Sequence, residues 1–344
     1  MSENQNSCKK IKIPAIDFIK AFCALGIICY HFSIHSNKLK WLTVAPNHQV
    51  GWGDYFVVSF FVISGALLFF HHSNIQSVLT FYKKRCLSIY PTFYASYLIV
   101  AFLEWILVPK SVLLHRPVKY YLYTLLGMDG YLRNFTRPHN YYILGEWFLG
   151  AILLLYLLYP ILTWLLQKDE KKYLLSVFSL FIITYNLKMF AQSPLRNIFS
   201  ICFSFSVGMA IAKHHLFSDN SLRVISIPLF ILFIITPFKT HFVINGQFGG
   251  IFLTFSLFII GEKIYNKNIL RQTISWLGRI SYEIFLVQHF IILFLLKIYM
   301  PQNNFSAIAL LLLTISTTII MASVLHMGVN KSKGKLAGII LKRF

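Results

Sequence analysis

Runs of about twenty apolar residues recur along the whole chain, and they limit the fold more than any other feature of the sequence. A helix needs about 20 mostly apolar residues to cross a bilayer, and in lipid a helix satisfies its own backbone polar groups. The sequence therefore predicts an all-α, polytopic membrane bundle of about ten transmembrane helices. The runs cover roughly residues 14–35, 54–71, 88–108, 144–166, 172–190, 196–213, 222–238, 246–263, 277–298 and 304–326.

The composition agrees with a bilayer as the solvent. Of the 344 residues, 57% are hydrophobic and 12% are charged, and the mean hydropathy is +0.64. An average soluble domain has about 25% charged residues, and one compact core could not bury this much apolar surface. The 19 Tyr and 6 Trp suit the two membrane–water interfaces, where an aromatic ring can lie in lipid while its polar atom stays wet.

The chain is strongly basic, with 32 Lys and Arg against 11 Asp and Glu and a net charge of +21. On a soluble protein this charge would suggest a nucleic-acid partner, but no basic helix or stacking motif stands apart from the apolar runs. Basic loops instead hold the cytoplasmic ends of membrane helices and contact anionic lipid heads. We therefore expect contact with the bilayer and no nucleic-acid partner.

The distribution of Lys and Arg predicts an orientation. If the N-terminus is cytoplasmic, the inner segments contain about twice as many cations as the outer segments. Both termini are then cytoplasmic, which an even number of crossings allows. The expected organisation is a cytoplasmic tail of residues 1–13, a transmembrane domain of residues 14–326 and a basic cytoplasmic tail of residues 327–344. The interruption at 109–143 is aromatic and basic, and we expect it to be partly re-entrant.

Familiar short motifs are few. The first apolar run has no small-residue cleavage site behind it, so we interpret it as a retained helix rather than a signal peptide. The five cysteines lack metal or disulfide spacing. A phosphate loop, a G-x-S-x-G elbow and an H-E-x-x-H motif are also lacking. We therefore expect no metal and no permanently bound cofactor.

The first apolar run contains three ionisable residues, Asp17, Lys20 and His31. A charge in hydrocarbon is costly, so such residues are functional candidates. Lys20 and His31 are eleven positions apart, which places them on one helix face about 16 Å apart along the axis. Asp17 can neutralise Lys20, and His31 has a suitable pKa for a general base. The alternative is that Lys20 extends to the inner surface while His31 ends the helix at the outer interface.

Polar residues also mark the next two segments. Asp54 begins the second apolar run, and Ser64 and Gly65 lie in its inner half, where small residues permit close helix packing. A basic cluster follows in the stretch FYKKRCLSIYPTFY. It is either an anchor at the cytoplasmic surface or a clamp for phosphates. The cluster consists of Lys83, Lys84 and Arg85.

Two later runs each begin near an acid. Glu146 and Trp147 stand at the outer edge of one run, where an acid also suits the start of a helix. In the run 277–298, Glu283 lies near the inner end and can pair with Arg279, four residues earlier. His289 lies deeper in the same run, and it is either a hydrogen-bonded structural residue or a functional one.

Four stretches, in this order, resemble the acyltransferase-3 family of membrane acyltransferases, which O-acetylate bacterial surface glycans. The first is similar to the family's Arg/Lys-x10-His helix, with Lys20 and His31 at the two key positions. The others resemble its FF-x-x-SG segment, its basic R-x-x-R-x-x-P stretch and its closing SY-x-x-[YF]-L helix. The stretches are IPAIDFIKAFCALGIICYHF, GDYFVVSFFVISGALL, FYKKRCLSIYPTFY and LGRISYEIFLVQHFII.

The chain departs from the family pattern at three positions. Ser88 stands where a second Arg is frequent, and Gln288 stands where His is common. Ile152 replaces a frequent Glu, so the role of that acid is absent or falls to Glu146. No appended extracellular hydrolase-like domain is recognised, and we expect the membrane unit to work alone or with a separate partner.

The resemblance implies an O-acetyltransferase of the bacterial plasma membrane. It would move an acetyl group from acetyl-CoA, or another acyl-CoA, to a hydroxyl of a cell-surface or capsular polysaccharide or of a lipid-linked oligosaccharide. Other glycan-assembly proteins are candidate partners. Lys83, Lys84 and Arg85 would hold the nucleotide phosphates, Lys20 would steady the pantetheine or thioester, and His31 would deprotonate the acceptor or carry the acyl group. The expected supporting residues are Asp17, Asp54, Ser64, Glu146, Trp147, Glu283 and His289.

Two alternatives remain at the level of sequence. A polysaccharide exporter or flippase would also be polytopic and basic inside, although the paired broken helices typical of transporters are not evident. A non-catalytic member of a glycan-assembly complex is the other alternative. The shared face of Lys20 and His31 argues against it, since a scaffold has no need of buried ionisable groups.

Overall fold

The computed structural model describes residues 14–107, 121–136, 144, 147–185, 194–238, 241–265 and 268–342. Within these ranges the regular structure is helical and no strand forms, which confirms the predicted all-α class. The α-helices are α1 (Pro14–Ser36), α2 (Trp52–His72), α3 (Val78–Leu107), α4 (Tyr121–Leu125), α5 (Asp129–Thr136), α6 (Phe148–Lys168), α7 (Glu170–Thr184), α8 (Ile198–Lys213), α9 (Asn220–Ile235), α10 (Phe242–Tyr265), α11 (Asn268–Arg279), α12 (Ser281–Ile298) and α13 (Asn304–Lys342). Short 3₁₀ turns are η1 (Lys40–Leu42), η4 (Pro194–Arg196) and η5 (Leu216–Ser218).

Among the described residues, seven helices are long and apolar enough to cross a membrane, namely α1, α2, α3, α6, α10, α12 and α13. The helices α8 and α9 are apolar but shorter, with 16 residues each, and α7 has 15. These ten helices occupy the ten apolar runs of the sequence. The protein is thus a multi-pass helical membrane protein, with three of its helices below the length of an average spanning helix.

Contacts near helix ends show that neighbouring helices run in opposite directions. At one end, Lys213 at the end of α8 donates to Glu170 at the start of α7, with 2.7 Å between nitrogen and oxygen. Arg223 at the start of α9 pairs with Glu262 near the end of α10, also at 2.7 Å. At the other end, Lys38 after α1 donates to the carbonyl of Gln302 before α13. The first and last described helices therefore have their free ends at the same end of the bundle.

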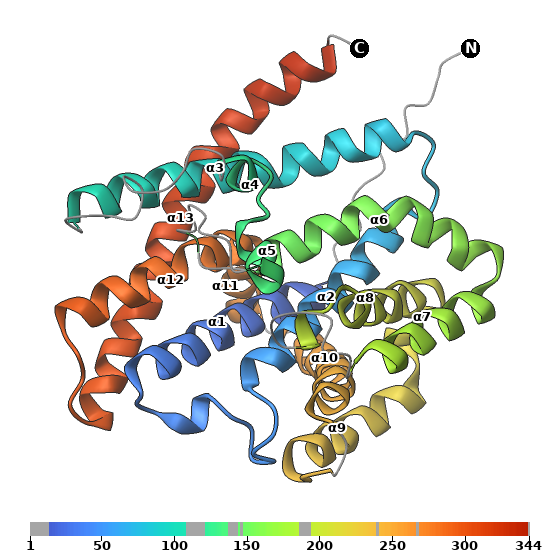
Figure 1. The fold of residues 1–344 in the computed structure, drawn as a ribbon, viewed down its shortest axis with the longest axis horizontal. Helices are drawn as coiled ribbons and strands as arrows, with labels where there is room; N and C mark the ends of the chain where they lie inside the picture. The colour runs from blue at the N-terminus through green and yellow to red at the C-terminus, as the bar shows by residue number, and fades with distance from the viewer. Residues whose placement is uncertain are drawn as a thin grey trace.

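We name the two ends by their residues. The basic end is the end at which α1 and α3 begin, after the cluster Lys83, Lys84 and Arg85. The opposite end is the histidine end, after His31 and His35 in the last two turns of α1. Figure 1 shows α3 along the top of the bundle, α12 on the left and the turn between α6 and α7 on the right. The last part of α13 continues beyond the bundle at the top, so residues 327–342 extend a helix.

Among the described helices, the closest backbone contact joins α2 to α8. A Cβ atom added to Gly65 would overlap the carbonyl oxygen of Phe205, and one added to Gly208 would overlap the carbonyl oxygen of Val62. The two backbones touch because neither glycine has a side chain. The small residue beside Ser64 therefore has the packing role expected from the sequence.

Two helix boundaries differ from the apolar runs. The helix α3 begins at Val78, well before residue 88, so the basic cluster lies within its first turns instead of a loop. Residues 277–298 divide into two helices, since α11 ends at Arg279 and α12 begins at Ser281. The mean hydropathy of a window does not detect this break, because α11 is amphipathic and its Trp276 and Leu277 pack on the core beside the last apolar run.

The interruption between α3 and α6 folds against the bundle where it is described. Tyr90 and Tyr94 of α3 donate to the carbonyl oxygens of Leu126 and Leu125 at the end of α4. The Tyr131 side chain of α5 is fully buried and packs on Gly150 of α6. The depth of the segment between α3 and α6 in the membrane is not shown, so its re-entrant character stays a prediction. Residues 1–13 lie outside the described part of the chain.

Candidate active site

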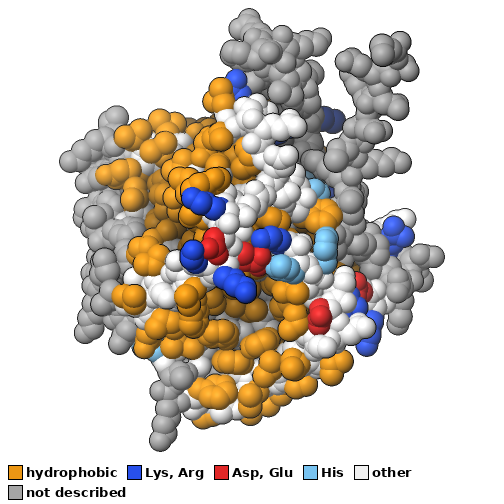
Figure 2. Space-filling model, turned by 90° about the vertical axis from the view of Figure 1, so that its right-hand side faces the viewer, with side chains coloured by type: hydrophobic (Ala, Val, Ile, Leu, Met, Phe, Trp, Pro, Cys, Tyr) orange, Lys and Arg blue, Asp and Glu red, His pale blue; other side chains and the backbone are white. Residues whose placement is uncertain are grey.

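A cavity of about 930 Å³ opens within the bundle near the basic end. Its walls come from the first halves of α1 and α3, the second half of α2, the beginning of α6 and the junction of α11 with α12. Figure 2 looks at the molecule from the side where α6 ends and α7 begins, and it shows charged side chains gathered at the middle of a largely hydrophobic face. The polar side chains that line the cavity are Asp17, Lys20, Ser64, His71, His72, Lys84, Arg85, Ser88, Tyr156, Arg279, Ser281 and Tyr282.

The helix α1 supplies an acid and a base to this wall. Asp17 and Lys20 both line the cavity, and the carboxylate lies close enough to act on the ammonium group electrostatically. Lys20 is half-buried in the wall. An ammonium held in a cavity wall is available to a ligand there, which is not true of one that extends to the membrane surface.

Arg85 carries a charge that no acidic residue of the described chain neutralises. Its Nη2 lies 3.4 Å from Nε2 of His72, and its guanidinium faces the rings of Phe81 and Tyr156 at 5.9 and 6.0 Å. Its Nε is buried and has no hydrogen-bond partner among the described residues. A planar cation with unused donors beside a cavity suits an anion such as a phosphate.

A second unused donor faces the same cavity. The hydroxyl of Tyr282, at the start of α12, is buried and has no hydrogen-bond partner within the described ranges. A buried donor left unsatisfied costs about 1–3 kcal/mol, so groups of this kind are normally satisfied by water or a ligand. Arg85 and Tyr282 together indicate that the cavity takes a polar ligand.

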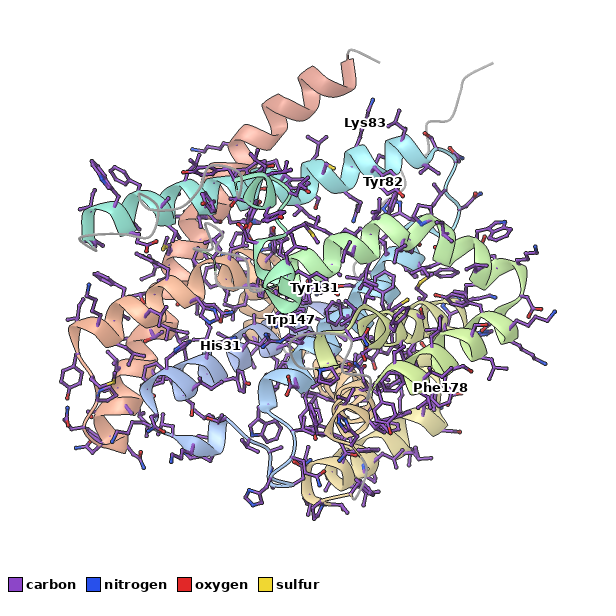
Figure 3. All side chains as sticks on the ribbon, in the orientation of Figure 1. His31, Tyr82, Lys83, Tyr131, Trp147 and Phe178 are labelled. Atoms are coloured by element: carbon purple, nitrogen blue, oxygen red, sulfur yellow. The ribbon has the colours of Figure 1, made fainter. Side chains whose placement is uncertain are left out.

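The basic cluster divides between two faces of α3. Lys84 and Arg85 line the cavity, whereas Lys83 is not among the lining residues. Figure 3 shows Lys83 on α3 at the top of the bundle, far from the labelled His31 and Trp147. Lys83 and Lys84 therefore point to different environments, because adjacent positions on a helix are about 100° apart.

Glu283 has a different partner from the expected one. Its Oε1 lies 2.8 Å from Nδ1 of His326 on α13, and Nε2 of His326 lies 2.9 Å from Asn330. The expected pairing with Arg279 is wrong, since the break between α11 and α12 ends the continuous helix that the four-residue spacing requires. Glu283 therefore joins α12 to α13, and it is not among the residues that line the cavity.

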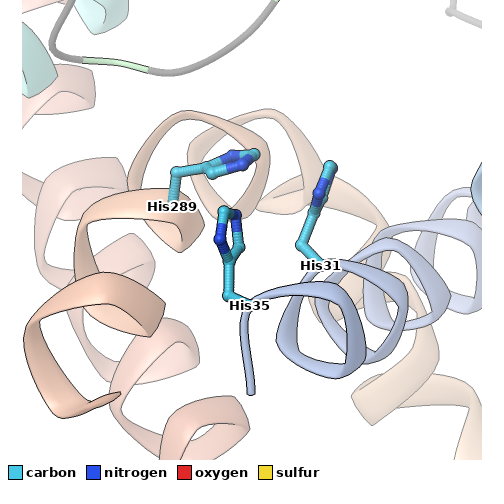
Figure 4. Close-up of side chains that lie close together, drawn as sticks. All are labelled: His31, His35 and His289. Atoms are coloured by element: carbon cyan, nitrogen blue, oxygen red, sulfur yellow. The ribbon is translucent and has the colours of Figure 1, made fainter. Parts of the chain in front are cut away.

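At the histidine end, three imidazoles form a cluster. The ring centroids of His31 and His289 are 4.2 Å apart, and those of His35 and His289 are 5.5 Å apart. One ring nitrogen from each of the three lies within 4.8 Å of the others. Figure 4 shows His31 and His35 on α1 and His289 reaching toward them from α12. We did not predict His35 from the sequence, although its four-residue spacing from His31 indicates one helix face.

Further polar residues lie near the same end. The ring of Tyr30 contacts His31 edge-on at 5.1 Å. Asp54, at the start of α2, interacts electrostatically with Arg196 of η4. The guanidinium of Arg196 lies 5.2 Å from the ring of Trp147, just before α6. The sequence analysis did not predict Arg196, because its contacts with Asp54 and Trp147 exist only in three dimensions. The predicted Glu146 lies outside the described residues.

Comparison with known families decides the class of protein. A family model described as an acyltransferase domain, that of the acyltransferase-3 family, matches residues 13–326. The chain belongs to the acyltransferase-3 family. It is therefore a membrane O-acyltransferase, and the match extends from α1 into the last helix. Searches of curated proteins and of solved structures found no match.

In this acyltransferase-3 protein, the four family stretches meet at one cavity. Each of α1, α2, α3 and α12 places residues of its stretch in the wall. Two departures from the family pattern, Ser88 and Ile152, also line the cavity. The wall thus lacks one cation and one acid of the usual pattern. Its cations are Lys20, Lys84, Arg85 and Arg279.

Proposed function

We propose that this acyltransferase-3 protein transfers an acetyl group from cytoplasmic acetyl-CoA to a hydroxyl of a cell-surface or capsular polysaccharide at the bacterial plasma membrane. The observation that carries the proposal is the cavity at the basic end, where Arg85 has no acidic partner among the described residues. Positive-inside asymmetry assigns this end to the cytoplasm, where coenzyme A is found. The histidine end then faces outward, where a glycan acceptor is found.

The donor site follows from the cavity wall. A volume of about 930 Å³ lies within the range of about 300–1,000 Å³ that ligand pockets occupy. Lys84 and Arg85 are assigned to the phosphates of the donor, and the apolar part of the wall, which includes Phe60, Phe148 and Phe285, is assigned to its pantetheine arm. Lys83 contributes only long-range positive charge, because its side chain does not line the cavity.

The acceptor chemistry is assigned to the histidine end of α1. His31 removes the proton of the acceptor hydroxyl as its oxygen attacks the thioester carbon. The carbon–oxygen bond forms, the carbon–sulfur bond breaks, and the proton on His31 passes to the departing thiolate. Lys20 and His31 are about 16 Å apart along α1. For this step the thioester therefore has to reach from the cavity wall at Lys20 to His31. His289 packs on His31 and orients its ring.

Deletion of the gene, followed by NMR of the surface glycan, tests the proposal. We expect loss of O-acetyl signals with normal polymer yield. Loss of exported polymer would instead indicate an exporter or flippase, the alternative function. A chromosomal His31→Gln variant should reproduce the loss of acetyl signals at unchanged membrane abundance. Full acetylation by this variant would overturn the assignment of His31 as the base.

A further inference from the structure

We propose that His31, His35 and His289 form a binding site for a divalent transition-metal ion of the Zn²⁺ class. We also infer that an ion bound there switches acetyl transfer off. The binding half of this inference stands on the histidine geometry alone, and the inhibitory half rests on the proposed function. The expectation of no metal was based on the absence of metal-type cysteine spacing and of an H-E-x-x-H motif. The histidine cluster fits neither pattern, because His289 comes from α12, a helix distant in sequence from α1.

The geometry of the cluster is close to that of a metal site. Zn–N bonds of about 2.0–2.1 Å in tetrahedral directions place the donor nitrogens about 3.3 Å apart. In the structure the three donors already lie within 4.8 Å of one another (Figure 4). The centroids of His31 and His35 are 6.4 Å apart, with both rings on one face of α1. Small side-chain rotations therefore bring the nitrogens to bonding distance without movement of the helices.

The donor set selects the class of ion. All three members of the cluster are imidazoles, which suit Zn²⁺, Cu²⁺ and Ni²⁺, whereas Ca²⁺ and Mg²⁺ require oxygen ligands. Three protein ligands leave a fourth position open to water. None of the three side chains is buried, so an ion can reach the cluster from outside the bundle.

Inhibition follows from the chemistry of His31. A general base needs a free lone pair on its ring nitrogen, and a coordinated metal ion uses that lone pair. A Zn²⁺ ion held by all three rings would also occupy the space in which the acceptor hydroxyl has to approach His31. Metal binding and acyl transfer therefore exclude each other at this residue. His35 belongs to the metal site alone, because nothing in the proposed reaction uses it.

Metal binding is tested first with the full-length protein, purified through a tag without histidines. Isothermal titration with ZnCl₂ alone should show one ion bound per chain, and Co²⁺ should give the visible absorption of tetrahedral coordination. His35→Ala should weaken Zn²⁺ binding at least about tenfold. The matched control is His48→Asn, which changes an exposed histidine of the α1–α2 loop at the same end. Asparagine tolerates the positive φ of 56° at that position.

Inhibition is tested next, by acetyl transfer with and without Zn²⁺. The wild type should lose activity as Zn²⁺ is added and regain it with a chelator. His35→Ala should retain basal transfer and lose the sensitivity, whereas His48→Asn should behave as the wild type does. Equal Zn²⁺ affinity of the wild type and His35→Ala would overturn the site. Zn²⁺ binding that leaves acetyl transfer unchanged or stimulates it would overturn the inhibitory role. An active His31→Gln variant would overturn His31 as the general base but would not affect the result on Zn²⁺ binding.

Discussion

Arg85 shows how much the function of one residue depends on its surroundings. Its guanidinium has aromatic rings nearby, a histidine at 3.4 Å and no carboxylate partner among the described residues. A charge held in this way favours an incoming anion, because the protein does not already satisfy its donors. Lys83, two positions earlier, has the same sign of charge but does not line the cavity.

The difference between these two residues leads to a prediction about donor binding. Arg85→Gln should raise the KM for acetyl-CoA about tenfold, since one charge-assisted hydrogen bond contributes about 1.5–3 kcal/mol. Lys84→Gln should have a smaller effect, because its exposed ammonium is better solvated. Lys83→Gln is the matched control and should leave KM nearly unchanged. Steady-state kinetics in proteoliposomes measures all three, and equal effects would favour a general membrane anchor.

At the scale of helices, the bundle is held together by small residues at some contacts and by buried polar pairs at others. The contact of α2 with α8 is of the first kind, with Gly65 and Gly208 against opposing carbonyl groups. The contact of α12 with α13 is of the second kind, with Glu283 beside His326. Apolar side chains alone specify helix pairing poorly in lipid, since lipid solvates them equally well.

The first kind of contact can be tested by adding a methyl group. Gly65→Ala should destabilise the protein by about 1–3 kcal/mol or more, because the new Cβ meets backbone that cannot rotate away. Gly208→Ala should do the same. Gly328→Ala on α13 is the control, since an added Cβ there has nothing within 4 Å. Thermal unfolding in detergent gives the comparison, and a neutral result at Gly65 would mean that the helices can separate slightly at little cost.

The second kind of contact can be tested by removing one partner. The side chain of Glu283 is 7% exposed, so His326→Ala would leave a buried carboxylate without its histidine. Breaking a buried pair in this way costs about 3–5 kcal/mol. Asn330→Ala should cost less, since it removes only the exposed hydrogen bond to His326. If His326→Ala unfolds at the wild-type temperature, Glu283 is satisfied by other means.

At the scale of the whole molecule, the opposite directions of neighbouring helices place both described ends of the chain at the same end of the bundle. The same alternation separates the cavity at the basic end from the histidines at the other end of α1. A transferase that joins a cytoplasmic donor to an outer acceptor requires this separation. The orientation of the bundle in the membrane is thus a central assumption of the proposed function.

The orientation can be measured by the labelling of cysteines with a membrane-impermeant maleimide. Cys86 is exposed at the basic end, and His48 is exposed in the loop at the histidine end. Intact cells should therefore label the His48→Cys variant but not the wild type. Permeabilised cells should label both proteins through Cys86. Labelling of the wild type in intact cells that is lost in a Cys86→Ser variant would place the basic end outside and contradict the proposed direction of transfer.

The sequence by itself determined the class of protein and the positions of its apolar helices. Hydropathy is summed along the chain, so each of the ten apolar runs predicts an apolar helix, whereas α4, α5 and α11 were not predicted. The spacing of Lys20 and His31 along a single helix is equally local. The order of four sequence stretches was sufficient to indicate the acyltransferase-3 family, which the family match confirms.

Only the tertiary structure decided which residues meet. The contacts of His35 with His289, of Glu283 with His326 and of Arg196 with Trp147 each join helices or turns that are distant in sequence. Because the chain breaks between α11 and α12, Glu283 contacts His326 instead of Arg279, and spacing along the sequence could not predict this partner. Such contacts depend on the rotation and crossing of packed helices, which arise from side-chain packing across the whole bundle rather than from the residues of any one segment.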